Sequence, residues 1–162
     1  MLFPVETDRN YSNIAAKSAV TQLATALNVY YAEYGHWPDF VGDGNFLDAE
    51  RNSQLIRSLT VRDIANNPRR ITYFEAPPAR ESGNGLTNGI TPEGVFVDPW
   101  GHPYRIILKA DHSGVIASPY LKDPKPKVQT HAIVWSLGKD GKQGAPKDEQ
   151  TSRGSDDIKS WE

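Results

Sequence analysis

The chain lacks cysteine altogether, which excludes disulfide bonds, thiolate catalysis and cysteine metal sites. It also lacks an excess of basic residues, because Lys and Arg total 18 against 20 Asp and Glu, a formal net charge of -2. This balance gives no electrostatic argument for binding nucleic acid. No apolar run approaches the roughly 20 residues that span a bilayer, and the opening "MLFPV" is too short for the core of a signal peptide.

Common catalytic motifs are missing as well. The sequence contains no G-x-S-x-G, no P-loop and no G-x-G-x-x-G. The four histidines share no metal-type spacing and are typical turn or surface residues: His36, His102, His112 and His131. Asp98, in "VDPWGHPY", could be a catalytic carboxylate, but Asp-Pro-Trp-Gly is also a typical turn in which Asp98 accepts backbone N–H bonds. Because no partner for acid–base chemistry accompanies it, we expect a turn and no enzyme.

Residues from Ser12 to Tyr34 contain no Gly or Pro and predict a long helix. Apolar residues recur there at spacings of four and three, the stripe of an amphipathic helix: Ala16, Val20, Leu23, Leu27, Tyr30 and Tyr34. Nothing upstream breaks the pattern, so the helix can begin as early as Pro4, and Gly35 is a natural stop. Four alanines would let a partner approach closely: Ala15, Ala19, Ala24 and Ala26.

The middle of the chain, residues 38–98, is interrupted by Gly, Pro and Asn clusters that mark turns and loops. Between these clusters the sequence predicts a short helix from Asp48 to Thr60 and a strand over 70–76, "RITYFEA". At 162 residues with 38% hydrophobic content, the whole chain suits one domain with a modest core.

The last part of the chain is β in character. The segments 104–110, "YRIILKA", and 114–118, "GVIAS", flank "DHSG", which predicts a hairpin. Residues 130–137, "THAIVWSL", predict a third strand with Ala132, Val134 and Ser136 on one face and Ile133, Trp135 and Leu137 on the other.

The order of these elements predicts an α+β fold, with a long N-terminal helix packed on a small antiparallel sheet of about three strands. We expect the stripe of Val20, Leu23, Leu27 and Tyr30 to face the sheet and to contact Ile106, Leu108 and Trp135. Trp100 and Tyr104, next to the Asp98 turn, should pack against the same helix.

Three acidic residues near the C-terminus form a candidate cation site. Asp140 lies in "GKDGKQG", where glycines permit a tight backbone, and Asp156 and Asp157 are adjacent in "SDDIKSW". Calcium prefers six to eight oxygen ligands, which three carboxylates, backbone carbonyls and water could supply. The pattern is not an EF-hand, because Lys142 occupies the third loop position and no Glu closes the loop. Spacing alone leaves a solvated acidic loop equally open.

Four motifs in this order carry a family resemblance: "YYAEYGHWP" after a long helix, "DPWGHPYRI", "SLGKDGKQG" and "DDIKSW". Together they resemble the major pseudopilin of type II secretion systems and, more broadly, type IV pilin-like proteins. The middle, residues 39–95, does not match, and the loop 142–154 is extended. The resemblance implies a single pilin-like ectodomain over residues 1–162, with a helical spine (1–36), a variable region (37–97), and a sheet with a C-terminal metal loop (98–162).

The resemblance also implies a function. Family members begin with a cleaved leader and an apolar helix, which this chain does not match, so it resembles a soluble ectodomain of a protein held at the periplasmic face of the bacterial inner membrane. Its expected role is that of a structural subunit of a periplasmic filament that drives protein export. The implied partners are other copies of itself, minor pseudopilins and inner-membrane platform proteins. The alternative is a pilin-like subunit for adhesion or DNA uptake, which four arginines keep open: Arg62, Arg69, Arg70 and Arg80.

In this family the last loop wraps a calcium ion. Carried over, the ligands are the carbonyl of Leu137 and the carboxylates of Asp140, Asp156 and Asp157, and Lys142 leaves one further ligand to water or to another residue. The apolar Ile158 and Trp161 would return the loop to the body of the domain.

Overall fold

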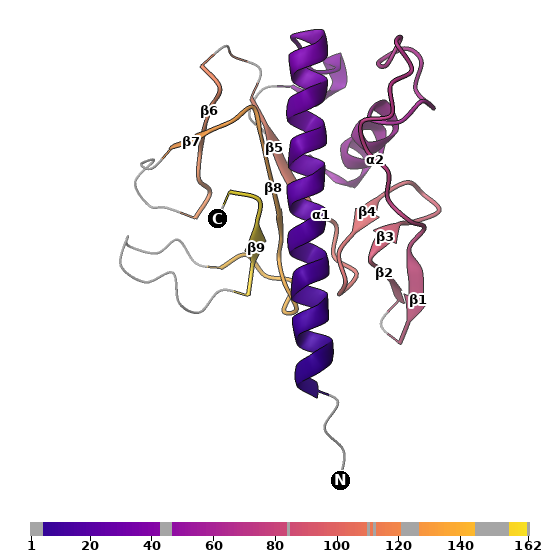
Figure 1. The fold of residues 1–162 in the computed structure, drawn as a ribbon, viewed down its shortest axis with the longest axis vertical. Helices are drawn as coiled ribbons and strands as arrows, with labels where there is room; N and C mark the ends of the chain where they lie inside the picture. Colours follow the sequence, from indigo (N-terminus) through magenta and orange to yellow (C-terminus); the bar gives the residue numbers. More distant parts are fainter. Residues whose placement is uncertain are drawn as a thin grey trace.

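The computed structural model describes residues 5–42, 47–83, 85–109, 111, 113–120, 127–144 and 156–161. The fold is α+β, with a long N-terminal helix lying against small antiparallel sheets (Figure 1). In chain order the elements are α1 (Val5–Tyr34), the 3-10 turn η1 (Asp39–Val41), α2 (Ala49–Ser58), β1 (Arg80–Ser82), β2 (Gly85–Thr87), β3 (Gly89–Ile90), β4 (Phe96–Val97), β5 (Arg105–Leu108), β6 (Val115–Ala117), β7 (Lys127–Gln129), β8 (Ala132–Ser136) and β9 (Ile158–Lys159).

The helix α1 confirms the long helix predicted from the stripe. Val20, Leu23, Leu27 and Tyr30 are almost fully buried in one hydrophobic core, which we call the α1 core. The helix ends where predicted, since Gly35 adopts the left-handed conformation (φ 72°) and its N–H donates to the Tyr31 carbonyl at 2.7 Å. Of the helices in the described part of the chain, none combines the length and the apolar character that crossing a bilayer requires.

The main sheet has three antiparallel strands in the order β5–β8–β9. Ile106 of β5 pairs with Val134 of β8, and Ser136 of β8 pairs with Ile158 of β9. The predicted hairpin between 104–110 and 114–118 is therefore wrong, because β5 pairs with β8 while β6 pairs with β7. Every residue of β8 is buried, so this strand needs a neighbour on both edges and takes the central place in the sheet.

The two faces of β8 contribute to two separate cores, as the predicted alternation requires. Ala132 and Val134 pack with α1, together with Ile106 and Leu108 of β5. Ile133, Trp135 and Leu137 form a second core with Ile107, Ile116 and Tyr120. The expected contact between Trp135 and the α1 stripe is wrong for this reason: successive residues of a strand point to opposite faces, and Trp135 lies on the face away from α1.

The middle region follows the prediction in part. The helix α2 begins after Asp48, whose side chain accepts the Arg51 N–H at 2.8 Å, an ordinary N-cap. The predicted strand over 70–76 does not form. Instead the N–H groups of Tyr73 and Phe74 both donate to the Leu59 carbonyl, at 2.9 and 3.2 Å, so this segment is tied to the end of α2 rather than to a ladder.

Candidate functional site

The Asp98 turn links the middle of the chain to the main sheet. Asp98 is fully buried, and one carboxylate oxygen accepts the N–H groups of Trp100 and His102, both at 2.9 Å, which confirms the predicted turn. The other oxygen accepts the Ser136 hydroxyl at 2.5 Å. Burial raises the pKa of the Asp98 carboxyl, and these hydrogen bonds offset part of the rise. Tyr104 is buried in the α1 core as expected, whereas Trp100 is half-buried and does not belong to that core.

The same turn fixes the start of the loop that follows β8 and carries Asp140, which we call the acidic loop. The Gly138 N–H donates to the Ser136 hydroxyl at 3.0 Å, and Nδ1 of His102 lies 3.0 Å from the Gly138 carbonyl oxygen. Gly141 has φ 65°, and a Cβ placed on it would lie only 2.6 Å from Nε2 of His102. The His102 ring therefore fills the space that a side chain at position 141 would need, and the glycine is required there.

The structure brings the predicted acidic residues onto one loop. Asp156 accepts the N–H of Asp140 at 3.1 Å, and Asp157 accepts the N–H of Gly144 at 2.7 Å. The Asp140 carboxylate accepts the N–H of Lys142 at 2.8 Å. Asp140 is exposed, while Asp156 and Asp157 are half-buried. The pair from the end of the chain thus closes over the loop that follows β8.

The oxygen ligands are of the type that calcium prefers, but they do not form a ready cage. Within the described part of the chain, no three His, Asp or Glu side chains are grouped so that they could hold a metal ion. Each of the three carboxylates is directed at a backbone N–H, and Leu137 is buried at the end of β8. Asp148 and Glu149, two further acids of the loop, lie outside the described residues. Each of these hydrogen bonds uses one oxygen of its carboxylate, so calcium binding by this loop requires the three side chains to turn their oxygens toward a common point.

The chain end returns to the sheet through Ile158 and Trp161, as the resemblance implied. Ile158 and Lys159 form β9, and the Ser160 N–H donates to the Val134 carbonyl at 2.9 Å. Nζ of Lys17 on α1 donates to the Lys159 carbonyl at 2.6 Å. Sequence reasoning did not identify β9 as a strand, because two residues are too short for a period-two pattern to be visible.

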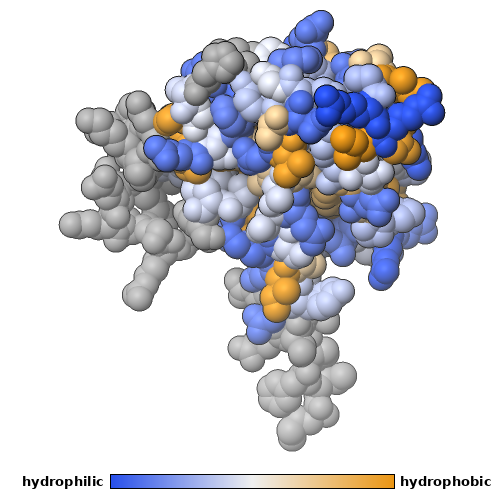
Figure 2. Space-filling model, turned by 45° about the horizontal axis from the view of Figure 1, so that its top comes forward, coloured by the Kyte–Doolittle hydropathy of each residue, from blue (hydrophilic) through white to orange (hydrophobic). Residues whose placement is uncertain are grey.

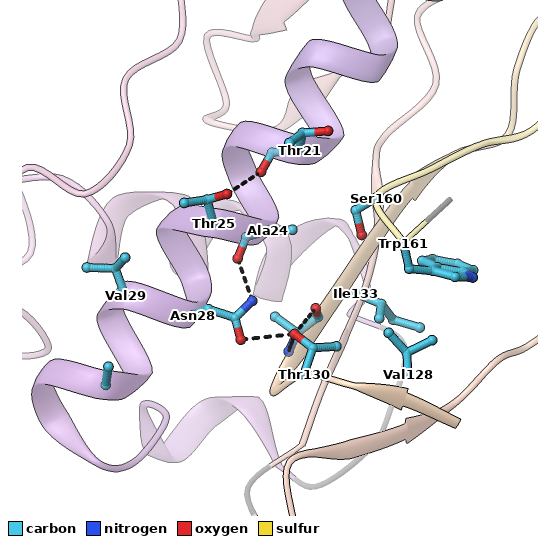
Figure 3. A pocket seen from close by; sticks show the side chains of 12 residues that line it. Thr21, Ala24, Thr25, Asn28, Val29, Val128, Thr130, Ile133, Ser160 and Trp161 are labelled. Atoms are coloured by element: carbon cyan, nitrogen blue, oxygen red, sulfur yellow. Dashed lines mark hydrogen bonds between the residues drawn. The ribbon is translucent and has the colours of Figure 1, made fainter. Parts of the chain in front are cut away.

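A second candidate surface is a groove between α1 and the start of β8, with a volume of about 470 Å³ (Figure 3). The hydroxyls of Thr21 and Thr25 donate back to helix carbonyls, at 2.9 and 2.8 Å. The Asn28 amide donates to the Ala24 carbonyl at 2.8 Å, and its oxygen accepts the Thr130 hydroxyl at 3.0 Å. Because these polar groups bond within the protein, the groove presents mainly methyl and aliphatic surface to a partner.

The opposite side of α1 carries another groove of about 520 Å³, between the helix and residues 71–75. Thr21, Thr25 and Val29 line both grooves. Val29 is half exposed. The outer face of α1 therefore lies between these two grooves. Because its side chains are short, another helix could approach it closely.

Four arginines left a role in adhesion or DNA uptake as the alternative function, and they lie in two different parts of the fold. Arg62, Arg69 and Arg70 belong to the loop after α2, whereas Arg80 begins β1. Arg69 forms an ion pair with Glu33 of α1. Because β1 lies well apart from the loop after α2 (Figure 1), the four do not form one continuous basic face.

Comparison of the chain with protein-family models, with curated proteins and with solved structures gives no match in any of the three. The structure itself defines a class, an α+β protein built on a long N-terminal helix and small antiparallel sheets. Its function is argued from the geometry of α1 and of the acidic loop.

Proposed function

We propose that the chain is the ectodomain of a structural filament subunit, a pseudopilin of a type II secretion system. The observation that carries this proposal is that α1 extends well beyond the part of it that is buried in the core. The helix is a single unbroken run of 30 residues, yet its first buried residue, among the side chains that the structure describes, is Ala16. Its N-terminal end projects away from the sheets (Figure 1).

The projecting part of α1 carries apolar side chains in solvent. Tyr11 is 70% exposed and Ile14 is 68% exposed. Exposed apolar surface on a helix that extends beyond its own core favours contact with another protein, because burial there removes area from water. The outer face between Thr21 and Val29, with its two flanking grooves, extends this accessible surface along the helix.

In the proposed assembly, α1 continues as an apolar helix held at the periplasmic face of the inner membrane, and copies stack with their helices inside and their sheets outside. Its partners are copies of itself, minor pseudopilins and inner-membrane platform proteins. Calcium, held by the Leu137 carbonyl and by Asp140, Asp156 and Asp157, closes the acidic loop on the sheet. Metal binding of this kind adds directly to folding stability.

Cysteine cross-linking tests the proposal without background, because the chain has no cysteine of its own. In the full-length protein, a variant with two cysteines on α1, Ile14→Cys and Val29→Cys, should give a ladder of disulfide-linked oligomers in the producing bacterium, because each copy can then be linked to two neighbours. The matched control carries Glu81→Cys and Ser113→Cys, two exposed positions outside α1, and should give no ladder. A single dimer band, or no cross-link, from the variant with both cysteines on α1 would contradict stacking through the helix.

A further inference from the structure

The loop after α2, residues 60–71, forms the end of the molecule opposite the N-terminus (Figure 1). Three of its aliphatic side chains face solvent: Val61 is 48% exposed, Ile64 54% and Ile71 38%. Figure 2 shows apolar and strongly hydrophilic surface side by side at the upper right, where this loop lies. Ile71 also lines the groove beside α1, but the proposed function does not account for the exposure of Val61 and Ile64.

The loop is held rigidly, so the exposure of these side chains is not a result of loose structure. Asn67 is fully buried, and its amide donates to the carbonyls of Thr60 and Ile71 at 3.0 and 2.7 Å. The amide oxygen accepts the Tyr34 hydroxyl at 2.8 Å and the Ile71 N–H at 3.2 Å. The Tyr30 hydroxyl donates to the Asn66 carbonyl at 2.6 Å. Both tyrosines belong to α1, so the C-terminal part of this helix holds the loop in place.

The acidic side chain of this loop, Asp63, forms hydrogen bonds with neighbouring residues of the same segment. The Asp63 carboxylate accepts the Ser58 hydroxyl at 3.1 Å and the Asn66 amide at 2.7 Å. Burial alone would raise the pKa of this carboxyl, but these hydrogen bonds outweigh burial and hold the pKa below its usual value. Asp63 thus stays ionised while it is bound within the loop.

Two of the three arginine side chains of this loop point into solvent without a carboxylate partner among the described residues. Arg69 pairs with Glu33, whereas Arg62 and Arg70 are exposed and form no ion pair among the described residues. Arg70 is also held in the left-handed conformation, with φ 53°. Non-glycine residues adopt this conformation at an energetic cost, and such strain is retained most often where a side chain must be placed for a function.

We propose that this patch, made of Val61, Arg62, Ile64, Arg70 and Ile71, binds the surface of an anionic lipid bilayer. Peripheral attachment combines shallow burial of apolar side chains with attraction between basic residues and anionic headgroups. The patch supplies both, and a flat surface can reach it because it lies at one end of the molecule. The charge complementarity favours anionic over neutral lipid. The inference is independent of the proposed function, which concerns α1.

Co-sedimentation with vesicles tests the proposal. The chain should bind vesicles of phosphatidylcholine mixed with phosphatidylglycerol, bind phosphatidylcholine alone weakly, and be released by high salt, which screens the headgroup charge. Arg62→Ser should weaken binding to the anionic vesicles about fivefold, and Ile64→Ser should weaken it several-fold through lost apolar contact.

The matched controls are Arg105→Ser and Ile14→Ser, which change an exposed arginine and an exposed isoleucine outside the patch. Both should bind like the unchanged chain, and all four variants should keep its circular dichroism spectrum. The proposal is overturned if the chain binds neither kind of vesicle, as expected of a patch that contacts an acidic protein or DNA instead. It is also overturned if the control variants lose as much binding as the patch variants.

Discussion

Trp161 lies edge-on against Trp135, with ring centroids 5.9 Å apart and ring planes at 81°. Tyr120 completes the cluster, 6.1 Å from Trp161 and 6.2 Å from Trp135. The end of the chain is therefore part of the second core, and β9 adds to the edge of β8. The acidic loop is consequently held by the same sheet at both of its ends.

Trp161→Ala should lower the free energy of unfolding by about 2–3 kcal/mol, less than for a fully buried tryptophan because Trp161 is half-buried. Urea denaturation measures this change. Tyr11→Ala, at an exposed aromatic residue of α1, is the control and should stay within about 0.5 kcal/mol. Equal stability of the Trp161→Ala variant and the unchanged chain would show that the aromatic cluster does not hold the chain end.

Leu27→Ala tests the packing of α1 on the sheet. Leu27 is fully buried in the α1 core, so its truncation should cost about 2–5 kcal/mol. Val29→Ala, two residues further along and half exposed, should change stability by less than about 0.5 kcal/mol. Thermal or urea unfolding of both variants compares the two faces of one helix. Similar losses for the two would contradict the register of α1.

Asp98 should make stability depend on pH. Burial raises the pKa of this carboxyl in the folded chain, so the unfolded chain loses its proton first as pH rises. Between the two pKa values the folded state binds more protons, and the contribution of Asp98 to stability falls with rising pH. Relative to Asp98→Asn, the unchanged chain should therefore lose stability as pH rises from about 4, the usual value of an Asp carboxyl. Urea midpoints that run parallel across this range would contradict the prediction.

Calcium should stabilise the fold if the acidic loop binds it. At about one hundred times its dissociation constant, an ion adds roughly 2.7 kcal/mol. A chelator should lower the melting temperature by several degrees, and calcium should restore it better than magnesium, which prefers a smaller octahedral site. Asp140→Ala should abolish the response, whereas Asp111→Ala, an exposed acid elsewhere, should not. Identical melting with chelator and with calcium would leave only an acidic loop closed by hydrogen bonds.

The sequence predicted those elements whose signal is local. The apolar spacing of α1 and the alternation in β8 both appear in the structure, because a helix stripe and a strand face each follow from neighbouring residues. The Asp98 turn was predicted for the same reason, since its Asp-Pro-Trp-Gly chemistry is contained in a few positions.

Long-range choices were not predictable in this way. The turn after β5 suggested a hairpin, but β8, which comes 24 positions after Leu108, is the strand that pairs with β5. Residues 70–76 have strand-like composition, yet the Leu59 carbonyl takes the N–H groups of Tyr73 and Phe74. The role of Asn67 was also missed, because one buried amide that bonds to Thr60, Ile71 and Tyr34 leaves no pattern in the sequence.

The most direct test of the filament proposal is electron cryomicroscopy of assemblies formed by the full-length protein. We expect helical filaments in which α1 lines the axis, the sheets face outward, and Tyr11 and Ile14 contact a neighbouring copy. Reconstruction at side-chain resolution would show these contacts directly. A full-length protein that forms no filament, or a filament in which α1 lies on the outside and Ile14 faces solvent, would contradict the account.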